Sequence, residues 1–346
     1  TTLNTKSVYI LILTVFFAAL VSVSASAAEE DTVPVTIDNL VRAETDHMIR
    51  ANIKSFGLEL GELVHQRETV DLDNQPVIRI NVDTIYTSLV LDLSKPAEVT
   101  LPEIGGRYQS MHVVNQDHYM FVESKPGTYK LTEEKVGTRF AAITFRTFVD
   151  PADPDDVKAA HAAQDGLKVS GGGKGPFEAP NWDQEDLAIA RKAFNDVAAA
   201  LGFDTRYAYG SKDEVRPVDF VVGAMAGWFG LPAKEAMYVL DSVEANDGKT
   251  PHAVTVKDVP VDAFWSITIY NADGYMEPNE LGRNSFNNVT AKPNDDGSYT
   301  IHFGGDPKAR NYLPITEGWN YTIRLYQPRQ EILDGSWTFP SIDPVK

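Results

Sequence analysis

The sequence predicts a mainly β protein in which two antiparallel β-sandwich domains of jelly-roll character are joined by a helical segment. Short runs of alternating apolar and polar residues, separated by Pro, Gly, Asp and Asn, fill residues 68–150 and return in residues 253–346. This pattern is typical of antiparallel sandwiches and not of alternating helices and strands. Between the two regions, apolar residues recur with the 3.6-residue period of helices, so we expect a helical insertion there.

The first 27 residues have the order of a secretory signal peptide. Lys6 is followed by an apolar run from Val8 to Val23 and then by the small residues Ala25, Ser26 and Ala27. This order predicts cleavage before Ala28 and a secreted or periplasmic protein. The alternative, a membrane anchor, needs about 20 apolar residues and usually lacks the small-residue exit.

Composition excludes several classes of function. The 346 residues contain no Cys, which rules out disulfides, thiolate metal sites and a cysteine nucleophile. The net charge of −18 would repel phosphate backbones and anionic lipid surfaces. We therefore expect no nucleic-acid partner and, after signal cleavage, no membrane partner. The composition does not decide whether the chain forms a homo-oligomer.

The first half of the mature chain divides into a helical start and a β domain. Residues 28–67 form an N-terminal helical segment, with one helix over residues 38–56. Residues 68–169 form the first sandwich, followed by a C-terminal helix that starts near Asp150. The acidic residues at the start of this helix favour helix capping over a calcium loop, because the alternating ligands and central Gly of an EF-hand are missing. The predicted strands are VIRINV, TIYTSLVLDL, AEVTLP, YQSMHVV, HYMFVE, TYKLT and RFAAITFRTFV.

Residues 170–252 are predicted to be a Gly-rich linker followed by helices. In SGGGKGPFEAP, Lys174 is followed by Gly and Pro, where a phosphate loop needs Ser or Thr and the start of a helix. Three helices follow, one after Asn181, one from Pro217 and one over residues 232–240. Residues 253–346 then form the second sandwich, with strands AVTV, AFWSITIY, NNVTAKP, SYTIHF and NYTIRLY.

The stretch INVDTIYTSLVLDL, residues 80–93, places a carboxylate in register with a buried face. In a regular strand, Asp83 points to the same side as Ile85, Leu89 and Leu91. An unpaired buried carboxylate is costly, so Asp83 must be paired, hydrogen-bonded or line a polar cavity. Arg79 and Arg146 are candidate partners. Asp83 then belongs either to an ion pair that fixes strand register or to a ligand pocket.

A catalytic site would draw on three residues of the first domain. Asp83 and Asp117 form a carboxylate pair of the kind that serves general acid/base chemistry on a glycoside, with His118 beside Asp117. We take these as catalytic candidates. His112 and His118 lie too far apart along a strand to bind one metal ion directly, and no HExxH or GxSxG motif occurs. No metal site and no cofactor are predicted.

Polar and aromatic residues in both domains are candidates for ligand binding. The loop after FWSITIY is rich in Asn, Asp, Glu and Arg, and such loops on a rigid sandwich often bind ligands. Near the C-terminus, Trp337 either stacks on a sugar or packs against Phe339 to fasten the chain end. The ligand-binding candidates are Asn81, Tyr86, Tyr119, Arg146, Tyr270, Arg283 and Trp337.

Several long motifs resemble known families. NVDTIYTSLVLDL, QDHYMF, KPGTYKLTEEKVGTRF, RTFVDPADPDDVKAAHAAQD and PNWDQ resemble the domain-of-unknown-function family 1254. FWSITIYNADGYMEPNELGRNSF, TAKPNDDGSYTIHFG and RLYQPRQEILDGSWTFP resemble family 1214, which commonly follows it in one exported bacterial chain. The resemblance covers the whole mature chain and implies β-rich domains around a helical segment, with no agreed activity. Val82 stands where the family usually has Arg.

Two hypotheses of function remain. In the first, the protein is a hydrolase or a ligand-binding protein that acts on a polar small molecule or glycan through a polar pocket in the first β domain. In the second, it is a non-catalytic structural or assembly module whose buried polar cluster only fixes strand register. The sequence does not decide whether the protein is an enzyme.

Overall fold

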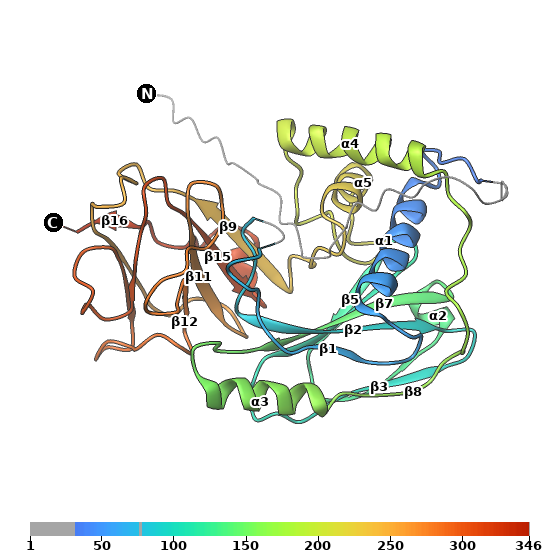
Figure 1. The fold of residues 1–346 in the computed structure, drawn as a ribbon, viewed down its shortest axis with the longest axis horizontal. Helices are drawn as coiled ribbons and strands as arrows, with labels where there is room; N and C mark the ends of the chain where they lie inside the picture. The colour runs from blue at the N-terminus through green and yellow to red at the C-terminus, as the bar shows by residue number, and fades with distance from the viewer. Residues whose placement is uncertain (1–31, 76–77, 346) are drawn as a thin grey trace.

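The computed structural model describes residues 32–75 and 78–345. The predicted signal peptide, with its apolar run from Val8 to Val23, lies outside these residues. Within the described part of the chain, no helix is both long and apolar enough to cross a membrane. The architecture is mainly β with a helical insertion, arranged as two domains, which confirms the predicted fold class (Figure 1).

The first domain is a sandwich of two antiparallel sheets. Its larger sheet has the order β1-β2-β7-β4-β5, and its smaller sheet the order β6-β3-β8. The apolar core between them includes Leu89, Val99, Val113 and Phe145. The larger sheet consists of β1 (Val64–Gln66), β2 (Thr84–Asp92), β7 (Phe140–Phe148), β4 (Gln109–Asn115) and β5 (Met120–Glu123), and the smaller sheet of β6 (Gly127–Leu131), β3 (Ala97–Leu101) and β8 (Lys168–Gly171).

Helices cover the other face of the larger sheet (Figure 1). Val90, Phe140 and Ala142 of the sheet pack against Ile49 of the first helix and Phe229. The central strands are therefore buried on both faces, which explains why their apolar alternation is incomplete. The helices of this domain are α1 (Leu40–Phe56), α4 (Gln184–Leu201) and α5 (Pro217–Ala226), with the short α2 (Glu133–Val136) and α3 (Pro154–Asp165) elsewhere on the sandwich.

Aspartate side chains cap two of these helices at their N-termini. The Asp153 side chain accepts hydrogen bonds from the backbone N–H groups of Asp155 and Asp156 at the start of α3. This arrangement agrees with the predicted capping role of the acidic cluster. Asp183 caps α4 in the same way, two residues after the predicted start at Asn181.

The second domain is also a sandwich. Its sheets have the orders β12-β11-β15-β9 and β14-β13-β10-β16, and Trp265, Ile301, Phe303 and Ile323 fill the core between them. All strand pairs are antiparallel except β13 with β14. The strands are β9 (Ala236–Asp241), β10 (His252–Val256), β11 (Trp265–Tyr270), β12 (Ser285–Asn287), β13 (Tyr299–Phe303), β14 (Tyr312–Leu313), β15 (Asn320–Tyr326) and β16 (Asp343–Pro344), with the short helix α6 (Gln330–Leu333).

Three predicted elements are wrong. The expected helix over residues 232–240 is instead strand β9, because its side chains alternate and it pairs with β15 along its whole length. In NNVTAKP only Asn287 belongs to a strand, as the last residue of β12, and residues 288–290 form a turn. The Asn287 side chain accepts hydrogen bonds from the backbone N–H groups of Val289 and Thr290 in this turn. The described part of VIRINV, residues 78–82, is not a strand. The predicted Gly-rich linker also begins inside β8, which ends at Gly171.

The two sandwiches meet through an aromatic cluster. Phe148 of β7 packs edge-on against Phe264 with ring centres 5.0 Å apart, and Phe264 stacks on Tyr326 at 4.2 Å. Beside this contact lies an open groove of about 1040 Å³, whose walls include Tyr108, Phe264 and Gln327. The domains therefore share an apolar contact, and the polar cluster described below lies at the same junction.

Candidate functional site

Asp83 is held at the start of β2 by its neighbours in the sequence. The Asn81 side chain accepts a hydrogen bond from the Asp83 backbone N–H at 2.8 Å and donates to the Thr84 hydroxyl at 2.9 Å. The Asp83 carbonyl accepts from the backbone N–H of Val149 at 3.0 Å. These contacts leave the Asp83 residue only 2% exposed and direct its carboxylate toward the second domain.

The hydrogen-bond donors to the Asp83 carboxylate come from the second domain. The Ser266 hydroxyl on β11 donates to Oδ2 at 2.5 Å, and the Ser285 hydroxyl on β12 lies 3.4 Å from Oδ1. Ser266 and Ser285 lie on paired neighbouring strands. Neither of the two predicted partners pairs with the Asp83 carboxylate. Arg146 donates a hydrogen bond to His112, and the backbone carbonyl of Arg79 accepts one from Arg324.

A buried arginine organises the same junction. Arg324 on β15 donates to the Thr268 hydroxyl at 3.1 Å, to the Tyr270 hydroxyl at 2.9 Å and to the Arg79 carbonyl at 2.8 Å. The Tyr270 hydroxyl in turn donates to the Ile80 carbonyl at 2.9 Å. The predicted ligand residue Tyr270 is therefore engaged in holding the chain segment that leads into Asp83.

Burial raises the pKa of the Asp83 carboxyl above its ordinary value. The positive charge of Arg324 and the hydroxyls of Ser266 and Ser285 act in the opposite direction, because they favour the ionised form. The net effect is a carboxyl that holds its proton more tightly than an exposed aspartate. Such perturbed groups in a cavity wall are common at functional sites and also occur in structural networks.

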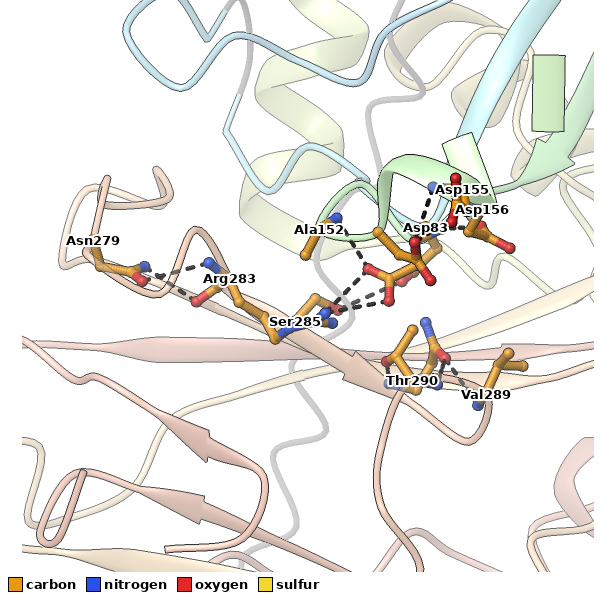
Figure 2. A network of polar contacts seen from close by, with 12 residues as sticks. Asp83, Ala152, Asp155, Asp156, Asn279, Arg283, Ser285, Val289 and Thr290 are labelled. Carbon is orange, nitrogen blue, oxygen red and sulfur yellow. Dashed lines mark hydrogen bonds and ion pairs between the residues drawn. The ribbon is translucent and has the colours of Figure 1, made fainter. Parts of the chain in front are cut away.

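Asp83 lines a cavity of about 110 Å³ between the two domains. Figure 2 shows Asp83 and Ser285 facing each other, with Ala152 and Arg283 nearby. Arg283 forms an ion pair with Asp150 at 3.1 Å, and the Asp150 backbone N–H donates to Asp156 at 2.7 Å. The polar wall consists of Thr69, Asp83, Asp150, Arg283, Asn284, Ser285, Asn287 and Thr290.

The structure does not bring Asp117 to Asp83. Phe148 of β7 is opposite Thr84, whereas Ala141, at the other end of β7, is opposite Asn115. Asp83 and Asp117 therefore lie at opposite ends of the sheet, roughly 23 Å apart along a strand. Paired glycosidase carboxyls are only about 5–9.5 Å apart. Asp117 instead forms an ion pair with Arg42 of α1, and its side chain is 43% exposed.

His118 serves the packing of the helical layer. It adopts a left-handed backbone conformation with φ 64°, and its Nε2 accepts from the Phe229 backbone N–H at 3.0 Å. Burial lowers its pKa to about 3, so the imidazole stays neutral. Beside it, Tyr119 stacks on Phe220 with ring centres 4.9 Å apart. The structure places His118 in an aromatic cluster, away from Asp83.

The remaining ligand candidates lie in different places. Tyr86 and Arg146 are cross-strand neighbours, with the guanidinium carbon 5.8 Å from the ring centre. Trp337 packs edge-on against Phe339, which contacts Trp265 of the second core. This arrangement agrees with a chain end fastened by aromatic packing. Among the residues that the structure describes, no cluster of His, Asp and Glu could hold a metal ion.

The half of the site that belongs to the second domain was not predicted from the sequence. Ser266, Ser285 and Arg324 were not predicted as site residues, although Arg324 is a charged residue at a buried position of the strand NYTIRLY. This buried charge is the sequence signal for a polar site in the second domain, because a buried guanidinium needs polar partners. The partner of Asp83 could not be identified from the sequence, because Ser266 lies 183 positions away from it.

Family comparisons agree with the two halves of the structure. Residues 60–171 match the family described as a protein of unknown function, DUF1254, and residues 235–330 match the corresponding family DUF1214. The chain is a DUF1254–DUF1214 protein. Asp83 belongs to the DUF1254 region, and Ser266, Ser285 and Arg324 belong to the DUF1214 region, so the site joins the two families.

Two solved structures resemble this fold. The VPA0106 protein of Vibrio parahaemolyticus is 22% identical, with a TM-score of 0.67, over 89% of this chain and 98% of that chain. An uncharacterised protein of Burkholderia cenocepacia is 14% identical, with a TM-score of 0.47, over 89% and 88% of the two chains. No curated protein sequence matches the chain. The Vibrio structure shows a shared fold.

The raised pKa of Asp83 predicts a pH-dependent effect of Asp83→Asn. The folded-state pKa lies above the unfolded value, so the contribution of Asp83 to stability is full below that unfolded value and is lost as pH rises through the folded-state pKa. Asparagine does not titrate. The unfolding free energy of the parent minus that of Asp83→Asn should therefore fall as the pH rises above the ordinary aspartate value of 3.8, as measured by urea denaturation.

Asp117→Asn is the matched control for the loss of one carboxylate. Its ion pair with Arg42 is partly exposed, so the variant should change stability by about 1 kcal/mol or less. A parent-minus-variant difference for Asp83→Asn that rises with pH would contradict the assigned environment of Asp83.

Proposed function

We propose that this DUF1254–DUF1214 protein binds a small, uncharged polar molecule in the cavity between its two domains. The observation that carries the proposal is the buried Asp83 carboxyl, which faces a cavity whose wall also holds Arg283, Asn287 and Thr290. A concave site with a few convergent polar groups and a perturbed carboxyl at a domain junction is the usual form of a ligand site.

The size of the cavity limits the ligand. Its volume of about 110 Å³ is below the ~150 Å³ of an engineered cavity that holds benzene. We expect a molecule of about four to six non-hydrogen atoms. Short polyols and small amides have this size, whereas an oligosaccharide does not fit the cavity in its present form.

The charges in the wall favour an uncharged ligand. Arg283 is neutralised by Asp150 at 3.1 Å, and Asp83 lies near the opposite charge of Arg324. The groups that remain for recognition are hydroxyl, amide and carboxyl groups, which exchange hydrogen bonds with hydroxyls or amides. The proposal is therefore binding and not hydrolysis, because Asp83, Asp117 and His118 do not form one site.

A second function is supported by the hydrogen bond between Ser266 and Asp83. At 2.5 Å this bond crosses the domain boundary and satisfies the carboxylate within the protein. The polar cluster would then act as an interdomain lock in a non-catalytic module. The two functions differ in whether occupation of the cavity stabilises the protein.

A thermal-shift screen tests the binding proposal. Polyols, small amides, short esters and organic acids are added to the parent protein, to Ala152→Leu and to Asp117→Asn. Ala152 lines the cavity, so leucine should occupy part of it without altering Asp83. A ligand at 100 times its Kd should stabilise the parent and Asp117→Asn by about 2.7 kcal/mol and should leave Ala152→Leu unchanged.

Two results would overturn binding in this cavity. One is that no molecule of this size raises the midpoint of the parent. The other is an equal shift in the parent and in Ala152→Leu, because the ligand would then bind elsewhere. Absence of binding together with earlier melting of Asp83→Asn would favour the interdomain lock.

We also propose that the protein is exported. The proposal is supported by Lys6, the apolar run from Val8 to Val23 and the small residues before Ala28. N-terminal sequencing of the protein recovered outside the cytoplasm should give Ala28 as its first residue. Recovery of an uncleaved chain in the membrane fraction would contradict export as a processed protein.

A further inference from the structure

A second polar cluster lies on the helix-facing side of the larger sheet. Arg146 of β7 is opposite Tyr86 of β2 and Ser110 of β4, and its side chain is fully buried. Its Nη1 donates to Nδ1 of His112 at 3.2 Å. Burial and the nearby charge of Arg146 lower the pKa of His112, so the imidazole accepts this bond in its neutral form.

The other terminal nitrogen of Arg146 has no hydrogen-bond partner. Nη2 is buried without a partner, and among the described residues no carboxylate lies within ion-pair distance of Arg146. The Tyr86 ring, 5.8 Å away, offers only a cation–π contact. A buried guanidinium with an unused donor edge is costly unless an acceptor meets it.

The balance of buried charge points in the same direction. The described interior of the domain junction contains two buried arginines, Arg146 and Arg324, and one buried aspartate, Asp83. Asp83 and the hydroxyls around it accompany Arg324. Arg146 therefore remains as an uncompensated positive charge inside a chain whose net charge is −18.

Glu235 does not supply the missing charge. Burial raises the pKa of its carboxyl to about 7, and its Oε2 is also buried without a partner. Its electrostatic interaction with Arg146 is weaker than that with Lys234. With a pKa of about 7, the Glu235 carboxyl is about half protonated at neutral pH, and in its protonated form it can donate a hydrogen bond. Glu235 and Arg146 together therefore suit an acceptor-rich ligand.

The large groove at the domain junction is connected to Arg146 through Tyr108 and Ser110. Tyr108 lines this groove, and its hydroxyl donates to the Ser110 hydroxyl at 3.1 Å. Ser110 is the cross-strand neighbour of Arg146. Arg146 itself does not line the groove, so access to it from this side requires the Tyr108 ring to move. Phe148 and Phe264 of the same wall would contact an apolar body.

We infer that Arg146 is the anchor of a second site, which binds a small carboxylate that enters from the groove beside Tyr108. The two oxygens of a carboxylate match the donor geometry of a guanidinium. The site is separate from the Asp83 cavity and does not depend on the function proposed there.

Acetate, propionate and benzoate, with chloride and bromide as comparison anions, test this inference by thermal shift and calorimetry. A carboxylate should bind the parent protein and bind Arg146→Met at least tenfold more weakly, with Arg146→Lys between the two. Arg42→Met is the matched control, because Arg42 is already paired with Asp117 far from both sites and its loss should leave carboxylate binding unchanged.

A structure of the parent protein soaked in 3-bromopropionate keeps the inference testable if the Arg146 variants do not fold. The anomalous bromine signal should lie beside Arg146, with the carboxylate on Nη2. Binding of halides alone, binding that Arg146→Met leaves intact, or bromine located only elsewhere would each overturn the inference.

Discussion

The hydrogen bond between Ser266 and Asp83 is the contact on which the arrangement of the domains depends. A carboxylate that belongs to the first sandwich is buried against hydroxyls that belong to the second, at 2.5 Å and 3.4 Å. Neither domain alone can satisfy this group, and an unsatisfied buried carboxylate is expensive. The polar junction therefore favours one relative position of the two sandwiches.

Other features of the junction follow from this position. Arg324 reaches the carbonyl of Arg79, and Tyr270 reaches the carbonyl of Ile80, so both side chains of the second domain hold the segment that leads into β2. The cavity beside Asp83 is lined by Asp150 and Ala152 from the first domain and by Ser285 from the second. Arg146, on the opposite side of the sheet end, is left without a comparable partner.

Much of the fold could be predicted from the sequence because it is encoded locally. Strand alternation identified most strands, the acidic cluster marked the start of α3, and the predicted Asn181 lay close to the start of α4. The burial of Asp83 also followed from its register with Leu89 and Leu91. Local patterns failed at residues 232–240, where pairing with β15 overrides helix propensity. They could not identify the partners of Asp83 or place Asp117, because chain topology decides both.

A double-mutant cycle between Asp83→Asn and Ser266→Ala tests most directly whether the two residues act together across the domain boundary. The unfolding free energies of the parent, both single variants and the double variant are measured by urea denaturation at neutral pH. We predict a coupling energy of about 1 kcal/mol or more, as expected for residues in direct contact. The control cycle of Asp117→Asn with Ser266→Ala should be additive within about 0.5 kcal/mol. Additivity in the Asp83 cycle would contradict the account.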